Sequence, residues 1–369
     1  MYNNNRFFQK IAFNLAYDNL GLTYPNPSVA ALLVKNGEIV SKAVTSKNGG
    51  SHAEYLAIKN SKLQNFANID LYVTLEPCSH IGKNPACAKL IVDSGIKRVF
   101  FSYYDSNPLI DGKGIKMLQD NGVECLHLPV YQDEYKGFSP LRYDRNQILI
   151  SLKNASSLDM KMALKNGESK WITNSQSRSF GHYLRRINDI TITGIGTILK
   201  DDPMFNCRID NKKQSHLAIL DSSLRIPFDA KVISQGLHKK IIIFFDKSLS
   251  DSNKLNLLQE YDHIDLVPIK RHPAGLDLNE ILSYLLINDY CSAIIESGPA
   301  LSSSFVREGL VDLYYIFNGH KILGTDAKNS FEIASPEKLI NSSNLSLIDV
   351  KTLGKDVLRV LAPKRLFKE

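Results

Sequence analysis

The chain has 369 residues, of which 43% are hydrophobic and 22% are charged. This length exceeds what one hydrophobic core usually supports, so we expect two domains, and the composition excludes a disordered or fibrous chain. The formal net charge of +7 comes from scattered lysines and arginines, which favours a solvated surface over a nucleic-acid interface and suits phosphorylated substrates.

Cysteine usage and the apolar pattern bear on the compartment. Five cysteines are an odd and low count, which argues against a disulfide framework and predicts a reducing compartment, most simply the cytoplasm. The polar start is followed by apolar residues at helical spacing, without the unbroken apolar run of a signal peptide. No stretch reaches membrane-spanning length, so we expect no membrane partner.

The first part of the chain alternates helical and strand patterns, which predicts a layered α/β sheet. Residues 71–75 (LYVTL) are short, β-branched and followed by Glu76-Pro77, so they are predicted to form a buried strand that ends in a loop. The other expected elements are helices near 6–20, from 52, near 86–94 and near 114–121, and strands near 28–34, 39–44, 98–102 and 123–128.

Near residues 132–146 the pattern lapses into charged and aromatic residues, and we place a domain boundary there. A new apolar run at 148–152 begins a second alternating series, again α/β. Its expected helices lie near 175–186 and 278–286, and its strands near 190–193, 217–220, 240–245 and 292–296. No internal repeat is evident, so residues 1–146 and 147–369 are predicted to be two different modules.

The informative residues of the first domain are His52, Glu54, Cys78 and Cys87. One imidazole and two thiolates suit tetrahedral zinc and leave a fourth position for water, as catalytic zinc sites require. Glu54 is not needed as a ligand, so it can take the water proton and deliver it to a leaving amine. The hydroxide attacks the ring carbon that bears the amine, and ammonia leaves. The pattern therefore predicts a zinc-dependent deaminase.

Two other interpretations of these residues stay open. The histidine can cap a helix and the cysteines can be buried like small apolar residues. A structural zinc site is also possible with His80 as a fourth ligand, although it would leave Glu54 without a role.

The second domain contains no G-x-G-x-x-G after a strand, so a Rossmann fingerprint is absent. Gly194-Ile-Gly196 and Glu296-Ser-Gly298 each follow a predicted strand. Turns at the carboxyl ends of strands are where open α/β sheets bind ligands, and their backbone N–H groups can face phosphate oxygens. Each turn alone is equally typical of a tight turn without a ligand.

The spacing of the two cysteines points to a particular family. Eight residues separate them, in the segment PCSHIGKNPAC that runs from Pro77 to Cys87. With PNPSV at 25–29 and DSNP at 105–108, this segment closely resembles the bifunctional riboflavin-biosynthesis deaminase/reductase family. The resemblance runs through nearly the whole chain. The segments that look like the family's reductase signatures are LKNASSLD at 152–159, SKWIT at 169–173, GIGTILKDDP at 194–203 and ESGP at 296–299.

The resemblance implies a cytidine-deaminase-like layered α/β domain followed by a dihydrofolate-reductase-like α/β domain. It implies deamination of 2,5-diamino-6-(5-phosphoribosylamino)pyrimidin-4-one, with zinc held by His52, Cys78 and Cys87 and the proton carried by Glu54. NADPH reduction of the ribosyl group of 5-amino-6-(5-phosphoribosylamino)uracil to ribityl would follow. The expected cofactors are Zn²⁺ and NADPH, and the expected partner is a phosphorylated pyrimidine, with no nucleic acid. A homo-oligomer is also expected.

The resemblance also assigns residues in the second domain. The cofactor positions are Ser156, Trp171, Thr197, Asp201, Ser222 and the turn that starts at Gly298. The substrate positions are Ser169, Arg185, Phe205, Arg208 and Glu296. Arg185 and Arg208 suit phosphate clamps, because guanidinium binds phosphate through paired hydrogen bonds. Without the flanking motifs, surface arginines and a core anchor at Trp171 are the alternative interpretations.

Three residues depart from the family pattern. Ala30 stands where glycine is usual, Thr45 stands where a substrate-facing histidine is common, and Met160 replaces the glycine of Ser-Leu-Asp-Gly. A larger side chain at position 160 could reshape the reductase pocket. Met160 keeps open the hypothesis of a deaminase with an inactive second domain. A separate hypothesis is a nucleic-acid-editing zinc deaminase with an appended binding domain, although the short C-x-x-C spacing that it predicts is not visible here.

Overall fold

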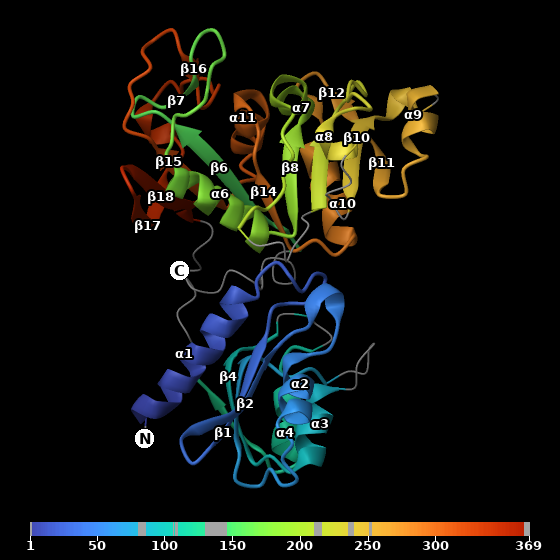
Figure 1. Cartoon of the computed structure of the whole chain (residues 1–369), viewed down its shortest axis with the longest axis vertical. Coiled ribbons are helices and arrows are strands. Elements are labelled where there is room, and N and C mark those ends of the chain that lie inside the picture. Colours follow the sequence, from blue (N-terminus) through green and yellow to red (C-terminus); the bar gives the residue numbers. More distant parts are fainter. Residues whose placement is uncertain are drawn as a thin grey trace. The chain divides into compact units, whose positions relative to one another are not determined.

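The computed structural model describes residues 2–79, 86–105, 107, 110–129, 146–209, 216–234, 240–250 and 253–364. The chain divides into two compact units, Met1–Asn146 and Gln147–Glu369. Each unit is a β-sheet covered by helices (Figure 1), so both are layered α/β structures. Within the described residues, no helix combines the length and the apolar character that crossing a membrane requires.

The first unit is built on a five-stranded sheet with the order β2-β1-β3-β4-β5. Strand β1 pairs antiparallel with β2 and β3, whereas β3, β4 and β5 are parallel. The bounds are β1 Ala30–Lys35, β2 Glu38–Val44, β3 Asp70–Leu75, β4 Arg98–Tyr103 and β5 Glu124–His127. The carboxyl ends of the parallel strands therefore meet at one edge of the sheet, where open α/β sheets bind ligands.

Helices cover both faces of this sheet (Figure 1). Side chains alternate across a strand, so Leu32 of β1 packs with Ala12 on one face while Leu33 packs with Ala57 on the other. This two-sided burial explains why residues 30–34 are continuously apolar rather than alternating. The helix bounds are α1 Tyr2–Asp18, α2 Ala53–Asn60, α3 Cys87–Ser94 and α4 Lys113–Asp120.

The second unit contains a nine-stranded sheet with the order β11-β10-β9-β8-β14-β6-β15-β18-β17. Neighbours from β11 to β15 are parallel, and β18 and β17 extend the sheet in antiparallel fashion. The bounds are β6 Leu149–Ser156, β8 Ile190–Gly194, β9 His216–Leu220, β10 Ile241–Asp246, β11 Ile264–Ile269, β14 Ser292–Ile295, β15 Leu313–Asn318, β17 Leu345–Leu353 and β18 Asp356–Pro363.

Two small sheets and several helices complete the second unit. The small sheets pair β12 (Arg271–His272) with β13 (Gly275–Leu276), and β16 (Lys328–Asn329) with β7 (Lys161–Ala163). The helices are α6 Ser175–Ile187, α7 Ile195–Asp201, α8 Lys231–Ser234, α9 Asn253–Leu258, α10 Leu278–Ile287 and α11 Pro299–Arg307. Because β9, β8 and β14 are neighbours, the turns that follow them lie at the same edge of the sheet.

The predicted α/β sheets are confirmed, and each helix and strand expected from the sequence is present with small shifts at its ends. The first helix was expected over 6–20 but spans Tyr2–Asp18. Strands β11, β15, β17 and β18, which complete the two sides of the second sheet, are not among the expected elements.

Candidate functional site

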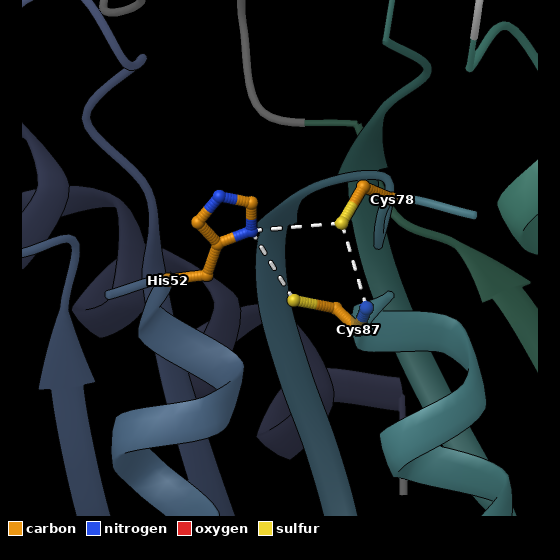
Figure 2. Close-up of side chains that lie close together, drawn as sticks. All are labelled: His52, Cys78 and Cys87. Atoms are coloured by element: carbon orange, nitrogen blue, oxygen red, sulfur yellow. Dashed lines mark hydrogen bonds between the residues drawn. The ribbon is translucent and has the colours of Figure 1, made fainter. Parts of the chain in front are cut away.

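The three expected zinc ligands come from the starts of two helices and the end of a strand. His52 is the N-cap residue of α2, Cys87 is the first residue of α3, and Cys78 follows the carboxyl end of β3. Figure 2 shows their side chains pointing toward one another. Both cysteines are buried, together with Ile110. The fold therefore converges these side chains on one point, although they are far apart in the sequence.

The distances between the ligand atoms fit a tetrahedral metal. His52 Nδ1 lies 3.3 Å from Cys87 Sγ and 3.5 Å from Cys78 Sγ (Figure 2). Two ligands at the usual zinc distances to nitrogen and sulfur, separated by a tetrahedral angle, lie about 3.6 Å apart. All three ligand atoms lie within 4.8 Å of one another. The residues present therefore fit zinc.

A thiol must be deprotonated and an imidazole neutral to bind a metal. Among the three ligand residues only Cys78 has its pKa shifted in that direction, because the hydrogen bond between the two thiols raises the pKa of Cys87. A hydrogen bond with the Cys87 thiol lowers the pKa of Cys78 to about 4, although burial acts in the opposite direction. The Cys78 sulfur in turn accepts a hydrogen bond from the Cys87 backbone N–H at 3.4 Å. A hydrogen bond with Cys78 raises the pKa of His52.

Glu54 lies in the first turn of α2 and is only 3% exposed. Burial raises the pKa of its carboxyl group to about 7, while the positive charge of His52 acts in the opposite direction. A carboxyl group with a pKa near neutrality can both accept and return a proton at the working pH. Glu54 lies two residues after His52, and its carboxyl group has a pKa near neutrality. Both features suit a residue that carries a proton.

The alternative of a structural site depends on His80, which lies outside the described residues. The other departures from the family pattern in this unit can be placed. Thr45 is buried, and its hydroxyl accepts a hydrogen bond from the Val29 N–H at 3.0 Å. Ala30 is also buried, and its N–H donates to Thr74 Oγ1 at 3.1 Å. Both residues therefore fix the start of β1 against its neighbours.

In the second unit, several expected cofactor positions share the carboxyl edge of the sheet. Thr197 is in α7 directly after β8, Ser222 follows β9, and Gly298 caps α11 after β14. A cavity of about 590 Å³ opens at this edge. Its lining includes Gly194, Gly196, Ser222, the β12–β13 hairpin and the start of α11. Of the expected cofactor positions, Ser222 lines this cavity, Thr197 is next to the lining residue Gly196, and Gly298 is two residues before the lining residue Ala300.

The remaining cofactor positions lie apart from that lining. Asp201 is exposed at the end of α7. Trp171 is 59% exposed, and the Arg178 guanidinium lies 4.1 Å from the centre of its ring. The core-anchor interpretation of Trp171 is therefore wrong, because a core tryptophan would be buried.

Ser156 ends β6 and is completely buried beneath Met160. Its hydroxyl donates to Met160 Sδ at 3.5 Å and accepts from Asn318 Nδ2 at 3.0 Å. Met160 adopts a φ of +56°, a backbone conformation that favours glycine. The methionine thus fills the space beside Ser156 and holds a backbone shape that suits the usual glycine better.

Three of the expected substrate positions converge on one buried ion pair. Arg185 Nη2 donates to Glu296 Oε2 at 2.8 Å, and Arg185 Nε donates to Oε1. The Arg185 guanidinium also lies over the Phe205 ring. Arg185 Nη1 donates to the Asn206 carbonyl at 3.1 Å, so this guanidinium is engaged on all three nitrogens. The guanidinium therefore holds Glu296 in place, and its expected role as a phosphate clamp stays a prediction.

Arg208 and Ser169 lie outside this ion pair. Arg208 is exposed, donates through Nε to Asn206 Oδ1 at 3.2 Å and lines a cavity of about 450 Å³. The other residues that line this cavity are Ser175, Arg178, Ser179, His182 and Ile209. Ser169 is partly exposed in the segment before α6.

Lys153, which is not among the expected site residues, also belongs to this cluster, because its Nζ lies 3.6 Å from Glu296 Oε2. The available signal was its place in an otherwise apolar strand run, ILISL at 148–152, where a lysine needs a partner.

Comparisons with known proteins match both units of the chain. A model of the cytidine and deoxycytidylate deaminase zinc-binding region matches residues 2–103, and a model of the RibD C-terminal domain matches residues 149–359. The chain is 36% identical over 365 residues to the riboflavin biosynthesis protein RibD of Bacillus amyloliquefaciens, covering 97% of this chain and 96% of that protein. It is 30% identical over 363 residues to RibD of Escherichia coli, covering 95% and 97%.

Solved structures are similar over the same length. The structure of Acinetobacter baumannii RibD superposes with a TM-score of 0.83 at 29% identity and covers 98% of this chain and 99% of that one. A diaminohydroxyphosphoribosylaminopyrimidine deaminase/5-amino-6-(5-phosphoribosylamino)uracil reductase from Thermotoga maritima gives a TM-score of 0.83 at 28% identity, with the same coverage.

Proposed function

This chain belongs to the RibD family of bifunctional riboflavin-biosynthesis enzymes, and from that premise we propose how its residues divide the work between two sites. The first unit is a cytidine-deaminase-like domain and the second is a dihydrofolate-reductase-like domain. The chain acts in riboflavin biosynthesis as a zinc-dependent deaminase and an NADPH-dependent reductase. An appended nucleic-acid-binding domain is not favoured, because residues 149–359 match the reductase family model.

The observation that carries the deaminase proposal is the convergence of His52, Cys78 and Cys87 beside a buried Glu54. The three ligands would hold zinc, which supplies a water that ionises near neutral pH. Glu54 accepts the proton of that water and returns it to the leaving amine of 2,5-diamino-6-(5-phosphoribosylamino)pyrimidin-4-one. The proton thus moves on one side chain from the nucleophile to the leaving group, and ammonia departs.

Removal of the metal tests whether zinc is needed for the deaminase reaction and not for the reductase reaction. Dialysis against a chelator is expected to abolish ammonia release, while NADPH oxidation with 5-amino-6-(5-phosphoribosylamino)uracil continues at its original rate. Restoring Zn²⁺ should restore ammonia release. Loss of both activities on chelation would contradict the assignment of zinc to the first unit alone.

For the second unit, we propose that NADPH occupies the carboxyl edge of the large sheet. The cavity is lined by Gly194, Gly196 and Ser222 and by the first turn of α11, and the free N–H groups of glycine turns and helix starts are typical phosphate-binding groups, which supports this placement. Thr197 and Gly298 would add contacts from neighbouring turns, and we keep Ser156, Trp171 and Asp201 as further cofactor positions. When bound, NADPH supplies the hydride. These residues would hold the cofactor so that its nicotinamide ring lies against the ribosyl carbon.

We propose that the substrate of the reductase contacts Glu296, Phe205 and Ser169, and that Arg208 binds the phosphate group of this substrate. Arg185 is committed to Glu296, so its proposed task is to hold that carboxylate toward the substrate. Arg208 is exposed beside a cavity that is also lined by Arg178, and two guanidinium groups on one cavity suit a phosphate.

Replacing Arg208 with alanine is expected to raise the KM for 5-amino-6-(5-phosphoribosylamino)uracil about 10- to 100-fold, because hydrogen bonds to a charged group contribute about 1.5–3 kcal/mol. The KM for NADPH should change less than about twofold. Steady-state NADPH oxidation measures both constants. The matched control is Lys355→Ala, which removes an exposed cation from the β17–β18 turn. Equal weakening of substrate and NADPH binding would count against a substrate phosphate clamp.

We also propose a homo-oligomer in the cytoplasm. Leu347, Val350 and Val357 are exposed on the antiparallel strands β17 and β18, and such apolar side chains support association. All five cysteines are free of disulfides, which agrees with a reducing compartment. Sedimentation equilibrium tests the assembly, and a single-chain mass at micromolar concentration would contradict it.

A further inference from the structure

Glu76 is a buried carboxylate between β3 and the zinc ligand Cys78, and the catalytic scheme gives it no task. It is only 3% exposed. Its Oε2 accepts hydrogen bonds from the backbone N–H groups of Gly112 at 2.9 Å and Asp105 at 3.2 Å. Its Oε1 accepts from Gly114 at 2.8 Å and Ile115 at 3.2 Å. One side chain therefore satisfies four backbone donors.

These donors come from two segments that are distant in sequence from Glu76. Asp105 follows β4, whereas Gly112, Gly114 and Ile115 form the N-cap and first turn of α4. The N–H groups of a first helical turn have no partner within the helix, and the helix dipole favours an anion there. The Glu76 carboxylate thus ties the end of β3 to the loop after β4 and to the start of α4.

The contact between α4 and the ligand-bearing loop is close. A Cβ atom on Gly114 would lie 1.8 Å from the carbonyl oxygen of Pro77. Only a residue without a side chain fits there, so α4 packs directly on the residue before Cys78. The position of the Cys78 backbone therefore depends on where Glu76 holds α4.

The packing leaves Cys78 little freedom to adjust by itself. The Ala88 N–H donates to the Cys78 carbonyl at 3.0 Å, and the Cys87 N–H donates to its sulfur. A shift of the loop at Pro77 would therefore be transmitted to the geometry of both sulfur ligands. Residues that orient metal ligands in this indirect way commonly change metal affinity 10- to 100-fold when they are replaced.

We propose that Glu76 is a positioning residue of the zinc site, which uses four backbone hydrogen bonds to set the place of Cys78. This inference rests on the proposed zinc function of the first unit. It assigns to Glu76 no contact with substrate or metal. The charge and both oxygens of the side chain are needed, because an amide group would present an N–H₂ donor to backbone N–H groups that are themselves donors.

The test compares Glu76→Gln with Asp70→Asn in the full-length chain. Asp70 lies at the opposite end of β3, where both oxygens accept hydrogen bonds from Arg98 at 2.7 Å, so Asp70→Asn removes a carboxylate from the same strand away from the ligands. Competition with a chromophoric chelator measures the zinc Kd. The Co²⁺-substituted chain gives absorption bands that report the geometry around the metal.

Glu76→Gln is expected to raise the zinc Kd about 10- to 100-fold and to shift the Co²⁺ bands, while NADPH oxidation by the second unit is unchanged. Asp70→Asn should leave the Kd and the bands as in the wild type. A merely structural role would lower stability without moving the Co²⁺ bands. Unchanged zinc affinity and bands in Glu76→Gln, or equal losses in both variants, would overturn the inference.

If Glu76→Gln does not yield folded protein, Glu76→Asp decides the question. Aspartate keeps the charge but is one methylene shorter, so it cannot reach all four donors. A several-fold weaker zinc Kd with shifted Co²⁺ bands supports the inference, and wild-type values overturn it. A wild-type chain that binds neither Zn²⁺ nor Co²⁺ would instead contradict the proposed function, so the two failures are distinguishable.

Discussion

Replacement of Glu54 by glutamine is expected to lower the rate of ammonia release about 10²- to 10⁴-fold while the chain keeps its zinc. The magnitude is that of losing a general acid–base group. Glutamine has nearly the same shape as glutamate, so the helix start that carries His52 should not move. It cannot accept the proton of the attacking water, however, and it cannot return one to the amine. Ammonia release and zinc content measured on the same sample provide the test.

A matched variant separates proton transfer from general damage to the first unit. Glu38→Gln changes an exposed carboxylate at the start of β2 and should leave ammonia release unchanged. NADPH oxidation with already deaminated substrate should be normal in both variants. If Glu54→Gln loses zinc together with activity, the proton-carrier role is wrong and Glu54 instead supports the metal.

The second large effect is expected for Glu296→Gln in the second unit. Burial alone would raise the pKa of Glu296, but the charges of Arg185 and Lys153 and the hydrogen bonds from Arg185 outweigh it and lower the pKa to about 2. The variant leaves the Arg185 guanidinium without a counter-charge in a buried place. Breaking a buried pair by removing one partner costs about 3 kcal/mol or more, and NADPH oxidation should be lost with the substrate contact.

The effect on stability should depend on pH in a defined direction. A carboxyl group whose pKa is lowered by folding stabilises the folded state above its unfolded pKa, about 4.3, and this contribution disappears as the pH falls toward 2. The free energy of unfolding of the wild type should therefore exceed that of Glu296→Gln most at pH 7. This difference in stability should shrink below pH 4. Denaturant unfolding at pH 7 and pH 3 measures it, with the exposed Glu337→Gln as a control. An equal difference at both pH values would show that the ion pair is not its source.

Much of the first site could be predicted because its information is local. His52, Glu54, Cys78 and Cys87 each stand next to a helix or strand end that the sequence pattern reveals, and parallel strands bring such ends together. The role of Glu76 could not be predicted in this way. Its partners lie at least 29 residues further along the chain, and a carboxylate before Pro-Cys gives no sign that four backbone groups will surround it.

The second unit was harder to predict for physical reasons. Strand β17 is half exposed along its length, so it lacks the apolar run that revealed β9 and β10. The pairing of Arg185 with Glu296 joins residues 111 positions apart, and only the fold brings them together. The two arginines expected to act alike therefore differ, because one is committed to a buried carboxylate and the other is exposed.

Met160 is the residue on which an inactive second unit would depend. Its side chain covers Ser156, an expected cofactor position, and its backbone adopts a conformation more natural for glycine. Other proposed reductase residues keep defined surroundings, since Arg185 pairs with Glu296 and Ser222 lines the cavity at the carboxyl edge of the sheet. We therefore expect the second unit to be an active reductase. Met160 should alter the shape of its pocket without abolishing the reaction.

The measurement that tests the bifunctional account most directly follows both reactions in one vessel. The zinc-loaded chain receives 2,5-diamino-6-(5-phosphoribosylamino)pyrimidin-4-one without NADPH, and ammonia is measured; NADPH is then added and its oxidation is followed. We expect ammonia release before any NADPH is present, and then oxidation of NADPH in an amount equal to the ammonia released. Ammonia without NADPH oxidation would confine the activity to the first unit and point to Met160, and no ammonia despite bound zinc would contradict the account.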